Sequence, residues 1–302
     1  MVNIEKIEYA GWPNCYRISN QIIELIVTAD VGPRVIRFGF IGDENEFFEN
    51  PEDRGKVGGD EWRLYGGHRL WHGPEDVIRT YMPDNFPLEV TLLEDGIILT
   101  APIEKPAGVQ KSIEIHLAKD KPQVSLLHNI RNTGLWPVTL APWAITVMNS
   151  NGTAIIPQTP RTEWPKILLP THSVTFWGYT RMSDPRWTWG DQYILLTQKP
   201  IPAKEQKIGL SNTEGWGAYL RNGHLFIKKF DYFPEKNYLD RNSNFECFTN
   251  QNIMELESLG PVQQIAPNQV TTHREEWHLF KNVTFQLNEK DIQQNINLYL
   301  EA

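Results

Sequence analysis

The feature that most constrains the fold is a series of short segments in which apolar residues recur at every second position. Residues 109–117 alternate almost strictly, and residues 34–40 follow the same pattern. A period of two places the apolar side chains on one face of a β-strand, and that face then needs a core to cover it. Residues 88–93 and 96–100 flank a turn at residues 94–95, which is typical of a β-hairpin. The sequence therefore predicts an all-β protein with antiparallel strands.

Helical patterns and domain boundaries are both scarce. The 21 prolines and 21 glycines are spread over the whole chain, and helical periodicity is nearly absent. One short helix is predicted within residues 289–295. No Gly/Ser linker and no block of charge divides the 302 residues, a length that all-β folds can reach in one unit. We therefore expect a single domain spanning residues 1–302.

The overall charge limits the classes of partner. The chain carries a formal net charge of −8 and has a pI of about 5.5. This acidic balance disfavours nucleic acid, which needs a basic face, and anionic membrane surfaces. No apolar run approaches the roughly 18 residues of a membrane span, and residues 1–6 lack the pattern of a secretion signal. Cys15 and Cys247 are far apart, so we expect reduced thiols in a cytoplasmic protein, with one long-range disulfide as the alternative.

Residues 65–75 hold the most informative side chains of the chain, set among glycines and a proline. They are His68, Arg69, Trp71, His72 and Glu75, with Trp62 just before them. A cation, imidazoles, a carboxylate and flat rings together suit a polar ring ligand such as a sugar, and Arg69 offers a planar fork to hydroxyls. On a helix His68 and His72 would share one face, as in a zinc site, but the glycines disfavour a helix, so no metal is expected. The structural alternative is that these side chains brace a loop.

A second candidate site lies late in the chain, where Glu255 and Glu257 are separated by Leu256. On a strand the two carboxylates share one face. If that face meets water, they are ordinary surface charges. If it lines a cavity, their repulsion raises one pKa and suits the pair to acid–base chemistry.

A third candidate is the lysine pair at positions 228 and 229. Strand alternation turns one of the two side chains inward, and we predict Lys228 as the site residue. A buried ammonium needs a carboxylate partner, which Glu246, Glu255 or Glu257 could supply. The result is either a structural ion pair or part of a sugar site.

Residues 164–191 are loop-like and contain tryptophans at positions 164, 177, 187 and 189. Long ordered loops are usually functional, and a tryptophan face stacks well on a flat ligand. We therefore expect Trp187 or Trp189 to contribute a stacking face.

Taken together, these segments resemble the galactose mutarotase-like (aldose 1-epimerase-like) superfamily over most of the chain. The supporting motifs are Gly32-Pro33-Arg34-Val35, Asn45-Glu46-Phe47-Phe48, the Gly-Gly-His segment, the late Glu-x-Glu and Ala266-Pro267-Asn268-Gln269 before the strand 271–280. The resemblance implies a large antiparallel β supersandwich, a small-molecule carbohydrate as ligand and no cofactor. It also implies that Glu255 is the general base on the anomeric hydroxyl, that His68 binds the sugar near its ring, and that Arg69 contacts it.

The sequence departs from this family at one position that matters for catalysis. The strand that should carry a second histidine, as acid on the ring oxygen, has Trp143 there instead. We therefore predict His72 as the replacement acid, and Trp71 and Trp143 as stacking faces. The other predicted sugar contacts are Glu75, Lys228, Glu246 and Glu257.

Mutarotation needs only a positioned base and acid, so an aldose 1-epimerase-like activity is the favoured prediction. A non-catalytic sugar-binding protein is the first alternative, because the family histidine is missing. The second is a polysaccharide lyase or hydrolase, with Tyr238, Asp240 or Glu246 facing Glu255.

Overall fold

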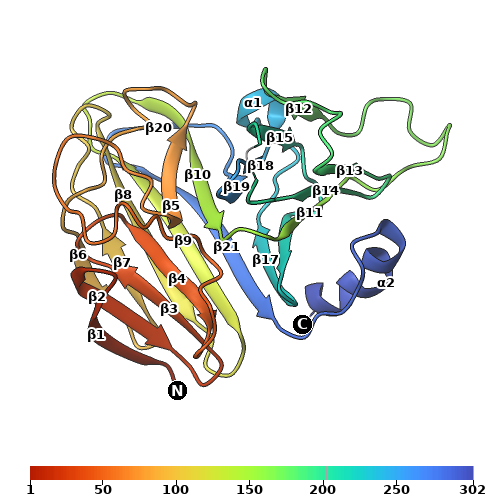
Figure 1. The fold of residues 1–302 in the computed structure, drawn as a ribbon. Helices are drawn as coiled ribbons and strands as arrows, with labels where there is room; N and C mark the ends of the chain where they lie inside the picture. The colour runs from red at the N-terminus through yellow and green to blue at the C-terminus, as the bar shows by residue number, and fades with distance from the viewer. Residues whose placement is uncertain (202, 302) are drawn as a thin grey trace.

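Two large antiparallel sheets make up the structure (Figure 1). The computed structural model describes residues 1–201 and 203–301. Within those residues the larger sheet has eleven strands. Their order is β1 (Asn3–Tyr9), β2 (Trp12–Ser19), β3 (Ile23–Thr28), β4 (Arg34–Phe40), β5 (Gly67–Gly73), β10 (Val138–Met148), β19 (Met254–Leu259), β18 (Phe245–Thr249), β15 (Gln206–Leu210) and β12 (Val174–Phe176), with β20 (Gln263–Ile265) paired to β10.

The second sheet has ten strands in the same described ranges. Their order is β13 (Trp187–Trp189), β14 (Tyr193–Thr197), β11 (Thr153–Pro157), β16 (Trp216–Arg221), β17 (His224–Phe230), β21 (Val270–Phe280), β9 (Gln123–Asn132), β8 (Val109–Leu117), β7 (Gly96–Thr100) and β6 (Glu89–Leu92). The pairing of β6 with β7 is the predicted hairpin. The all-β, antiparallel prediction is confirmed.

The strand with the clearest alternation in sequence shows how the core forms. Along β8, Val109, Ile113 and Ile115 are fully buried, and the residues between the buried positions stay partly exposed. The buried face belongs to one apolar cluster that also contains Val27 of β3 and Leu256 of β19. Because these residues come from both sheets, the main core lies between them. The opposite faces of the sheets are then available for loops, the C-terminal helix and pockets.

The two helices are short. The first, α1 (Leu239–Asn242), is a single turn, and the second, α2 (Glu289–Leu300), matches the helix expected near the C-terminus. The Asn288 side chain caps α2 by accepting from the Asp291 backbone N–H, which satisfies one free donor of the first turn. Ile292 and Ile296 bury one stripe of α2 against the outer face of the ten-stranded sheet. Neither helix has the length and apolarity to cross a membrane, as far as the described residues go.

Both cysteines are free and buried, Cys15 on β2 and Cys247 on β18. Burial raises the pKa of Cys15 to about 11. Burial also raises the pKa of Cys247 well above its ordinary value. Because the thiolate is the reactive form, these two thiols are core residues and not nucleophiles.

Residues 65–75, whose glycines and proline indicate either a loop or a strand end, are mostly the central strand β5. Two glycines with positive φ, Gly66 at 97° and Gly67 at 70°, lead into it. A Cβ on Gly66 would lie 2.0 Å from the Phe48 carbonyl oxygen, and one on Gly67 would lie 2.2 Å from the Val35 oxygen. Glycine therefore allows the chain to enter the sheet tightly between β4 and β10. The glycines mark a strand start instead of a loop that displays side chains.

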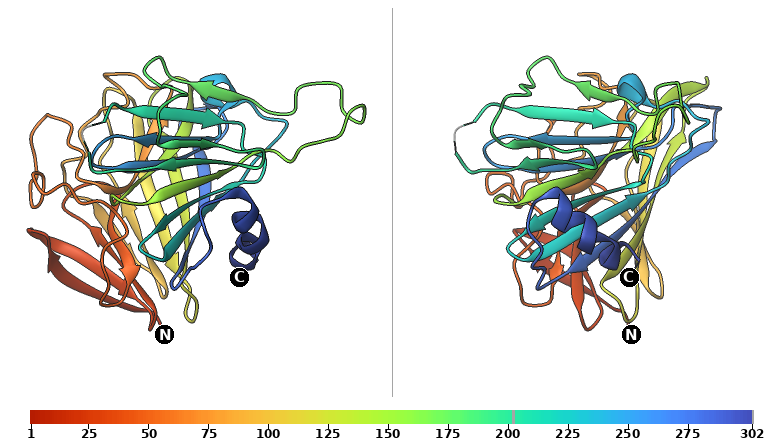
Figure 2. Two further views of the ribbon diagram at one scale, coloured as in Figure 1. Left: turned by 45° about the vertical axis from the view of Figure 1, so that its right-hand side comes forward. Right: turned by 90° about the vertical axis from the view of Figure 1, so that its right-hand side faces the viewer.

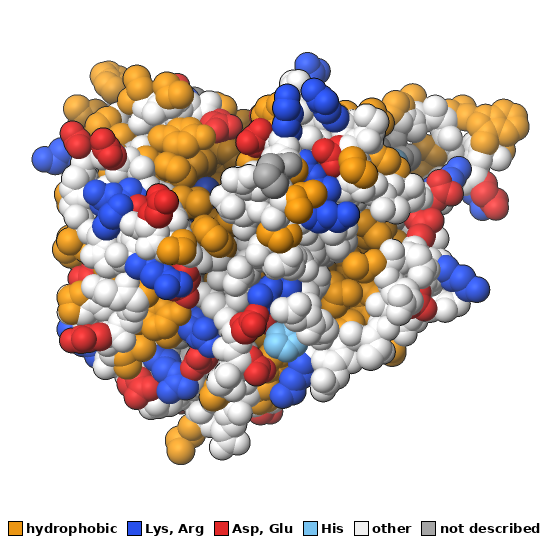
Figure 3. Space-filling model, viewed as in Figure 1, with side chains coloured by type: hydrophobic (Ala, Val, Ile, Leu, Met, Phe, Trp, Pro, Cys, Tyr) orange, Lys and Arg blue, Asp and Glu red, His pale blue; other side chains and the backbone are white. Residues whose placement is uncertain are grey.

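The predicted tryptophan-rich loop is partly ordered as β12 and β13. Between β11 and β12 the chain extends well away from the two sheets (Figure 2). The tip of this extension carries exposed apolar side chains, which stand out at the upper right of Figure 3. The exposed large apolar residues of this extension are Trp164, Ile167, Leu168 and Leu169. Trp187 is instead buried in the core between the sheets.

Candidate functional site

A pocket of about 310 Å³ opens on the outer face of the eleven-stranded sheet. Strand alternation on five neighbouring strands points its lining side chains to the same side. Arg69 and Glu257 both stand opposite Ile145, one from each side of β10. The polar and aromatic side chains in the lining are Trp62, Arg69, Trp71, Glu75, Tyr81, Trp143, Tyr179, Lys207, Phe248, Asn250, Glu255 and Glu257. Six of the residues predicted from sequence are therefore brought together here.

Arg69 connects the aromatic and acidic sides of the pocket. Its Nη2 donates to Glu255 Oε1 at 3.2 Å. Its guanidinium lies over the Trp71 ring, 4.5 Å from the centroid, in a cation–π contact. Its Nε and Nη1 are buried and have no partner among the described residues. A buried donor without a partner is costly, so Arg69 can gain two hydrogen bonds from an oxygen-rich ligand.

A buried ion cluster forms the opposite side. Lys207 Nζ lies 2.7 Å from Glu246 Oε2 and 2.9 Å from Glu257 Oε2. Glu257 Oε2 also accepts from Trp143 Nε1 at 2.9 Å, while Glu257 Oε1 is buried without a partner in the described chain. Two carboxyls thus face one ammonium, with all three groups almost inaccessible to water.

Burial controls protonation in this cluster. It raises the pKa of Glu257 and raises that of Glu246 well above its ordinary value, against the opposing effect of Lys207. Burial works against the charged form of Lys207, but the two carboxylates outweigh it and hold the Lys207 pKa well above normal. A second buried negative charge would have no counter-ion, so protonation of one of the two carboxyls is favoured. The cluster can therefore donate a proton into the pocket through Glu257.

Aromatic rings close the side of the pocket next to β5. The Trp71 ring centroid lies 5.5 Å from that of Trp143, 5.6 Å from Trp62 and 4.8 Å from Tyr81. The Tyr81 hydroxyl donates to Glu75 Oε1 at 2.6 Å. Edge-on packing of this kind holds the rings rigidly, which suits a surface that stacks on a sugar.

Comparison with known proteins gives the fold. No family model matches the sequence, and neither does any curated protein. The Slr1438 protein from Synechocystis sp. PCC 6803 superposes with a TM-score of 0.59 and 10% identity, over 92% of this chain and 99% of its own. A candidate mutarotase from Salmonella typhimurium superposes with a TM-score of 0.58 and 8% identity, over 92% of this chain and 94% of its own. A galactose mutarotase-like protein from Lactobacillus casei superposes with a TM-score of 0.52 and 8% identity, over 92% of this chain and 100% of its own.

The fold is that of the galactose mutarotase-like proteins. The predicted supersandwich is thereby confirmed. At 8–10% identity the likeness concerns the backbone, so the residues of this chain have to be judged from their own geometry.

The structure does not bring His68 to the pocket, contrary to the resemblance-based prediction. His68 is the neighbour of Arg69 on β5, so its side chain points to the opposite face, between the sheets. There it is fully buried and contacts Thr146 Oγ1 at 2.9 Å and His128 Nε2 at 2.7 Å. Burial lowers its pKa well below the ordinary value. A group with these surroundings is a core brace and cannot touch a ligand in the pocket.

His72 lies on the same inner face and also fails to reach the pocket. It is 3% exposed, and burial lowers its pKa to about 3. A neutral, buried imidazole that faces the core cannot replace the missing family acid. The prediction of His72 as the acid is therefore wrong, because His72 lies on the inner face of β5 and the pocket is on the outer face.

Lys228 belongs to the inter-sheet core and does not line the pocket. Its Nζ donates to the carbonyls of Ala144 and Leu256, at 3.2 and 3.0 Å, and pairs with Glu275 Oε1 at 2.9 Å. The sequence correctly indicated a buried lysine, but its carboxylate partner comes from β21. Glu246 was predicted as a sugar contact, yet it lies behind Lys207 and does not line the pocket.

His68, His128 and Glu275 are close enough to suggest metal ligands, with ligand atoms within 4.8 Å of one another. Their polar atoms already have partners. The two histidines bond each other, and Glu275 accepts from Trp277 Nε1 at 2.8 Å and pairs with Lys228. A dication would add positive charge where Lys228 already neutralises Glu275, so these residues fit an ion-pair network better than a metal.

Several residues of the pocket lining were not predicted from the sequence, and Lys207, Tyr81 and Tyr179 are the most informative of them. Lys207 is one residue in a short strand without a motif, and only the pairing of β15 with β18 brings it beside Glu257. Tyr81 and Tyr179 come from irregular segments. Trp187 and Trp189, which were expected to stack on a sugar, do not line the pocket, nor do Tyr238 and Asp240.

Proposed function

We propose that this pocket binds a carbohydrate and catalyses aldose 1-epimerase-like interconversion of its anomers. The observation that carries the proposal is the placement of Glu255 and Glu257 on one face of β19, inside a pocket with aromatic walls. Alternate residues of a strand are about 7 Å apart. The hydroxyl and ring oxygens of a hemiacetal share one carbon, so hydrogen bonds of about 2.7 Å on each side can bridge that gap.

In this proposal Glu255 is the general base. One of its oxygens accepts from Arg69, and the other has no partner among the described residues, which leaves it available to the anomeric hydroxyl. Glu257 is the general acid and takes over the role first given to the histidines. Lys207 and Trp143 occupy its Oε2, so the proton of the acid form is carried by Oε1, which has no partner among the described residues.

The reaction then balances without a cofactor. Glu255 removes the proton from O1, the C1–O1 bond becomes a carbonyl, the bond between C1 and the ring oxygen breaks, and Glu257 protonates that oxygen. After rotation about C1–C2 the open chain recloses with both proton transfers reversed. Each positioned proton transfer is worth roughly 10²–10⁴-fold in rate. The names of the structural neighbours, a candidate mutarotase and a galactose mutarotase-like protein, agree with this chemistry.

The assignment of base and acid can be tested by exchange NMR on the anomers of D-galactose and D-glucose. We expect Glu255→Gln and Glu257→Gln each to reduce the catalysed exchange rate by about 10²-fold or more. Glu89→Gln, on the exposed edge strand β6, is the matched control and should exchange at the wild-type rate. If sugars bind but all four proteins exchange at the spontaneous rate, the protein is a non-catalytic sugar-binding protein.

A further inference from the structure

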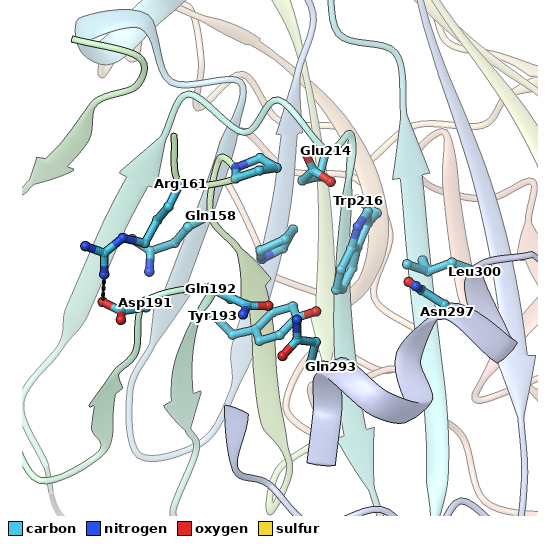
Figure 4. A pocket seen from close by; sticks show the side chains of 12 residues that line it. Gln158, Arg161, Asp191, Gln192, Tyr193, Glu214, Trp216, Gln293, Asn297 and Leu300 are labelled. Atoms are coloured by element: carbon cyan, nitrogen blue, oxygen red, sulfur yellow. Dashed lines mark ion pairs between the residues drawn. The ribbon is translucent and has the colours of Figure 1, made fainter. Parts of the chain in front are cut away.

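A second cavity, of about 410 Å³, lies between α2 and the outer face of the ten-stranded sheet (Figure 4). Its volume is in the range of about 300–1,000 Å³ that is typical of small-molecule sites. It shares no lining residue with the pocket beside β5. Its lining includes Gln158, Gln192, Tyr193, Trp216, Gln293 and Asn297.

The walls of this cavity are held in place at both ends of α2. At the N-terminal end, Glu289 Oε1 accepts from the backbone N–H groups of Gln192 and Tyr193 at the start of β14. At the other end, Lys229 Nζ donates to the Leu300 carbonyl at 2.7 Å. The space between helix and sheet is therefore a defined cleft, which lowers the cost of ordering a bound ligand.

Aromatic rings form the base of the cleft. Trp216 is 6% exposed, and its ring centroid lies 6.2 Å from that of Tyr193. Both residues pack on the apolar cluster that Ile292 and Ile296 of α2 complete. The two rings are tilted by 50° to each other and Trp216 is nearly covered, so the platform that a ring-shaped ligand can contact is mainly the partly exposed Tyr193 ring.

Primary amides surround this platform. Gln293 and Asn297 are four residues apart, so they lie on one face of α2, and Gln192 is on the opposite wall, as Figure 4 shows. The amides of these three side chains form no hydrogen bond with the described part of the chain, whereas Gln158 Nε2 is fixed by the Gly190 carbonyl at 2.6 Å. An amide both donates and accepts, which matches the mixed donor and acceptor character of hydroxyl groups.

The charges at the cleft favour a neutral ligand. Its only cation in the described lining, Arg161, is paired with Asp191 at 2.6 Å. Glu214 adds a negative charge. An anionic ligand would meet a carboxylate without a free cation to balance it.

We infer that this cleft is a second ligand site that binds a neutral, hydroxyl-rich ring, namely one or two saccharide units, independently of the pocket beside β5. The inference goes beyond the proposed activity, because it uses neither Glu255 nor Glu257. Ligand contact with the Tyr193 ring and hydrogen bonds from Gln293 and Asn297 are its defining contacts.

The site can be tested on the full chain by NMR titration with D-glucose, maltose and cellobiose, followed through tryptophan indole and side-chain amide signals. We expect at least one of these sugars to shift the signals of Trp216, Gln293 and Asn297. The variant Gln293→Ala/Asn297→Ala should weaken that response at least 10-fold. Gln294→Ala, on another face of the same helix, is the matched control and should keep the wild-type affinity.

Three results would overturn the inference. They are no shift at these signals with any of the three sugars at 50 mM, an unchanged response in the double variant, or equal binding of glucose 6-phosphate at this cleft. Tyr193→Leu, which retains apolar packing at this partly exposed position, provides a second variant and should weaken the response without unfolding the chain. The variant Glu255→Gln should leave this cleft unaffected, so a failure here is distinguishable from a failure of the proposed activity.

Discussion

Replacing Lys207 by methionine tests the buried ion cluster beneath the pocket. The change removes the one cation within 3 Å of both Glu246 and Glu257, whose residues are 0% and 1% exposed. Removing one partner of a buried ion pair typically costs about 3–5 kcal/mol, because the remaining charge is left uncompensated. We expect the free energy of unfolding of Lys207→Met to fall by that amount at pH 7.

The loss should depend on pH in a defined direction. Without Lys207 the pKa values of Glu246 and Glu257 in the folded state rise further above the unfolded value of about 4.3. At a pH between the unfolded and the folded pKa, the folded state therefore binds more protons than the unfolded state. The variant is therefore destabilised as pH rises and recovers as pH falls. One additional bound proton changes the deficit by at most about 2.7 kcal/mol between pH 7 and pH 5.

Urea denaturation at pH 5 and pH 7 measures this deficit for wild type and variant. Lys119→Met is the control, because Lys119 is 63% exposed and its pair with Glu94 is worth at most about 1 kcal/mol. The triple change Lys207→Met/Glu246→Gln/Glu257→Gln should recover much of the loss at pH 7. Equal stability of Lys207→Met and wild type at pH 7, or a deficit that is the same at both pH values, would refute the reasoning.

Three further predictions concern single side chains. Arg69→Lys should weaken sugar binding by about 10- to 150-fold in calorimetry, because charge-assisted hydrogen bonds worth about 1.5–3 kcal/mol are lost. An unchanged affinity would contradict the proposed role of the Arg69 guanidinium. His72→Leu should flatten the fall in stability between pH 6 and pH 4 in urea titrations. The folded pKa of His72, about 3, lies below the unfolded 6.5, so the unfolded state binds more protons there, and an unchanged slope would disprove this. Lys228→Met should lower the free energy of unfolding by about 3–5 kcal/mol, because the Glu275 carboxylate loses its ion-pair partner. Lys228→Met/Glu275→Gln should recover part of this loss, and a loss below about 1 kcal/mol in the single variant would argue against the ion pair.

The strand pattern could be predicted from the sequence because it depends on local alternation. The period of two along residues 109–117 became β8 with its buried face inward, and the expected C-terminal helix became α2. The same rule placed Glu255 and Glu257 together on one face of β19. Strand periodicity, and which residues share a face of one strand, can therefore be predicted from the sequence.

Features that depend on the side of the sheet could not be read from sequence. His68 and Arg69 are neighbours in sequence but lie on opposite faces of β5, one in the core and one in the pocket. Grouping both in one site assumed a loop, where no alternation applies. Pairings across strands were equally hidden. The partner of Lys228 came from β21, and Lys207 met Glu257 only through β15 and β18.

Anomeric exchange is the measurement that tests the central claim most directly. With α-D-galactose, α-D-glucose and a wider panel of aldoses, we expect wild type to accelerate exchange of at least one sugar in proportion to enzyme concentration. We also expect Glu255→Gln to reduce that acceleration by about 10²-fold or more. Exchange at the spontaneous rate with every sugar, or a Glu255→Gln protein as active as wild type, would contradict the proposed base and the activity of this pocket.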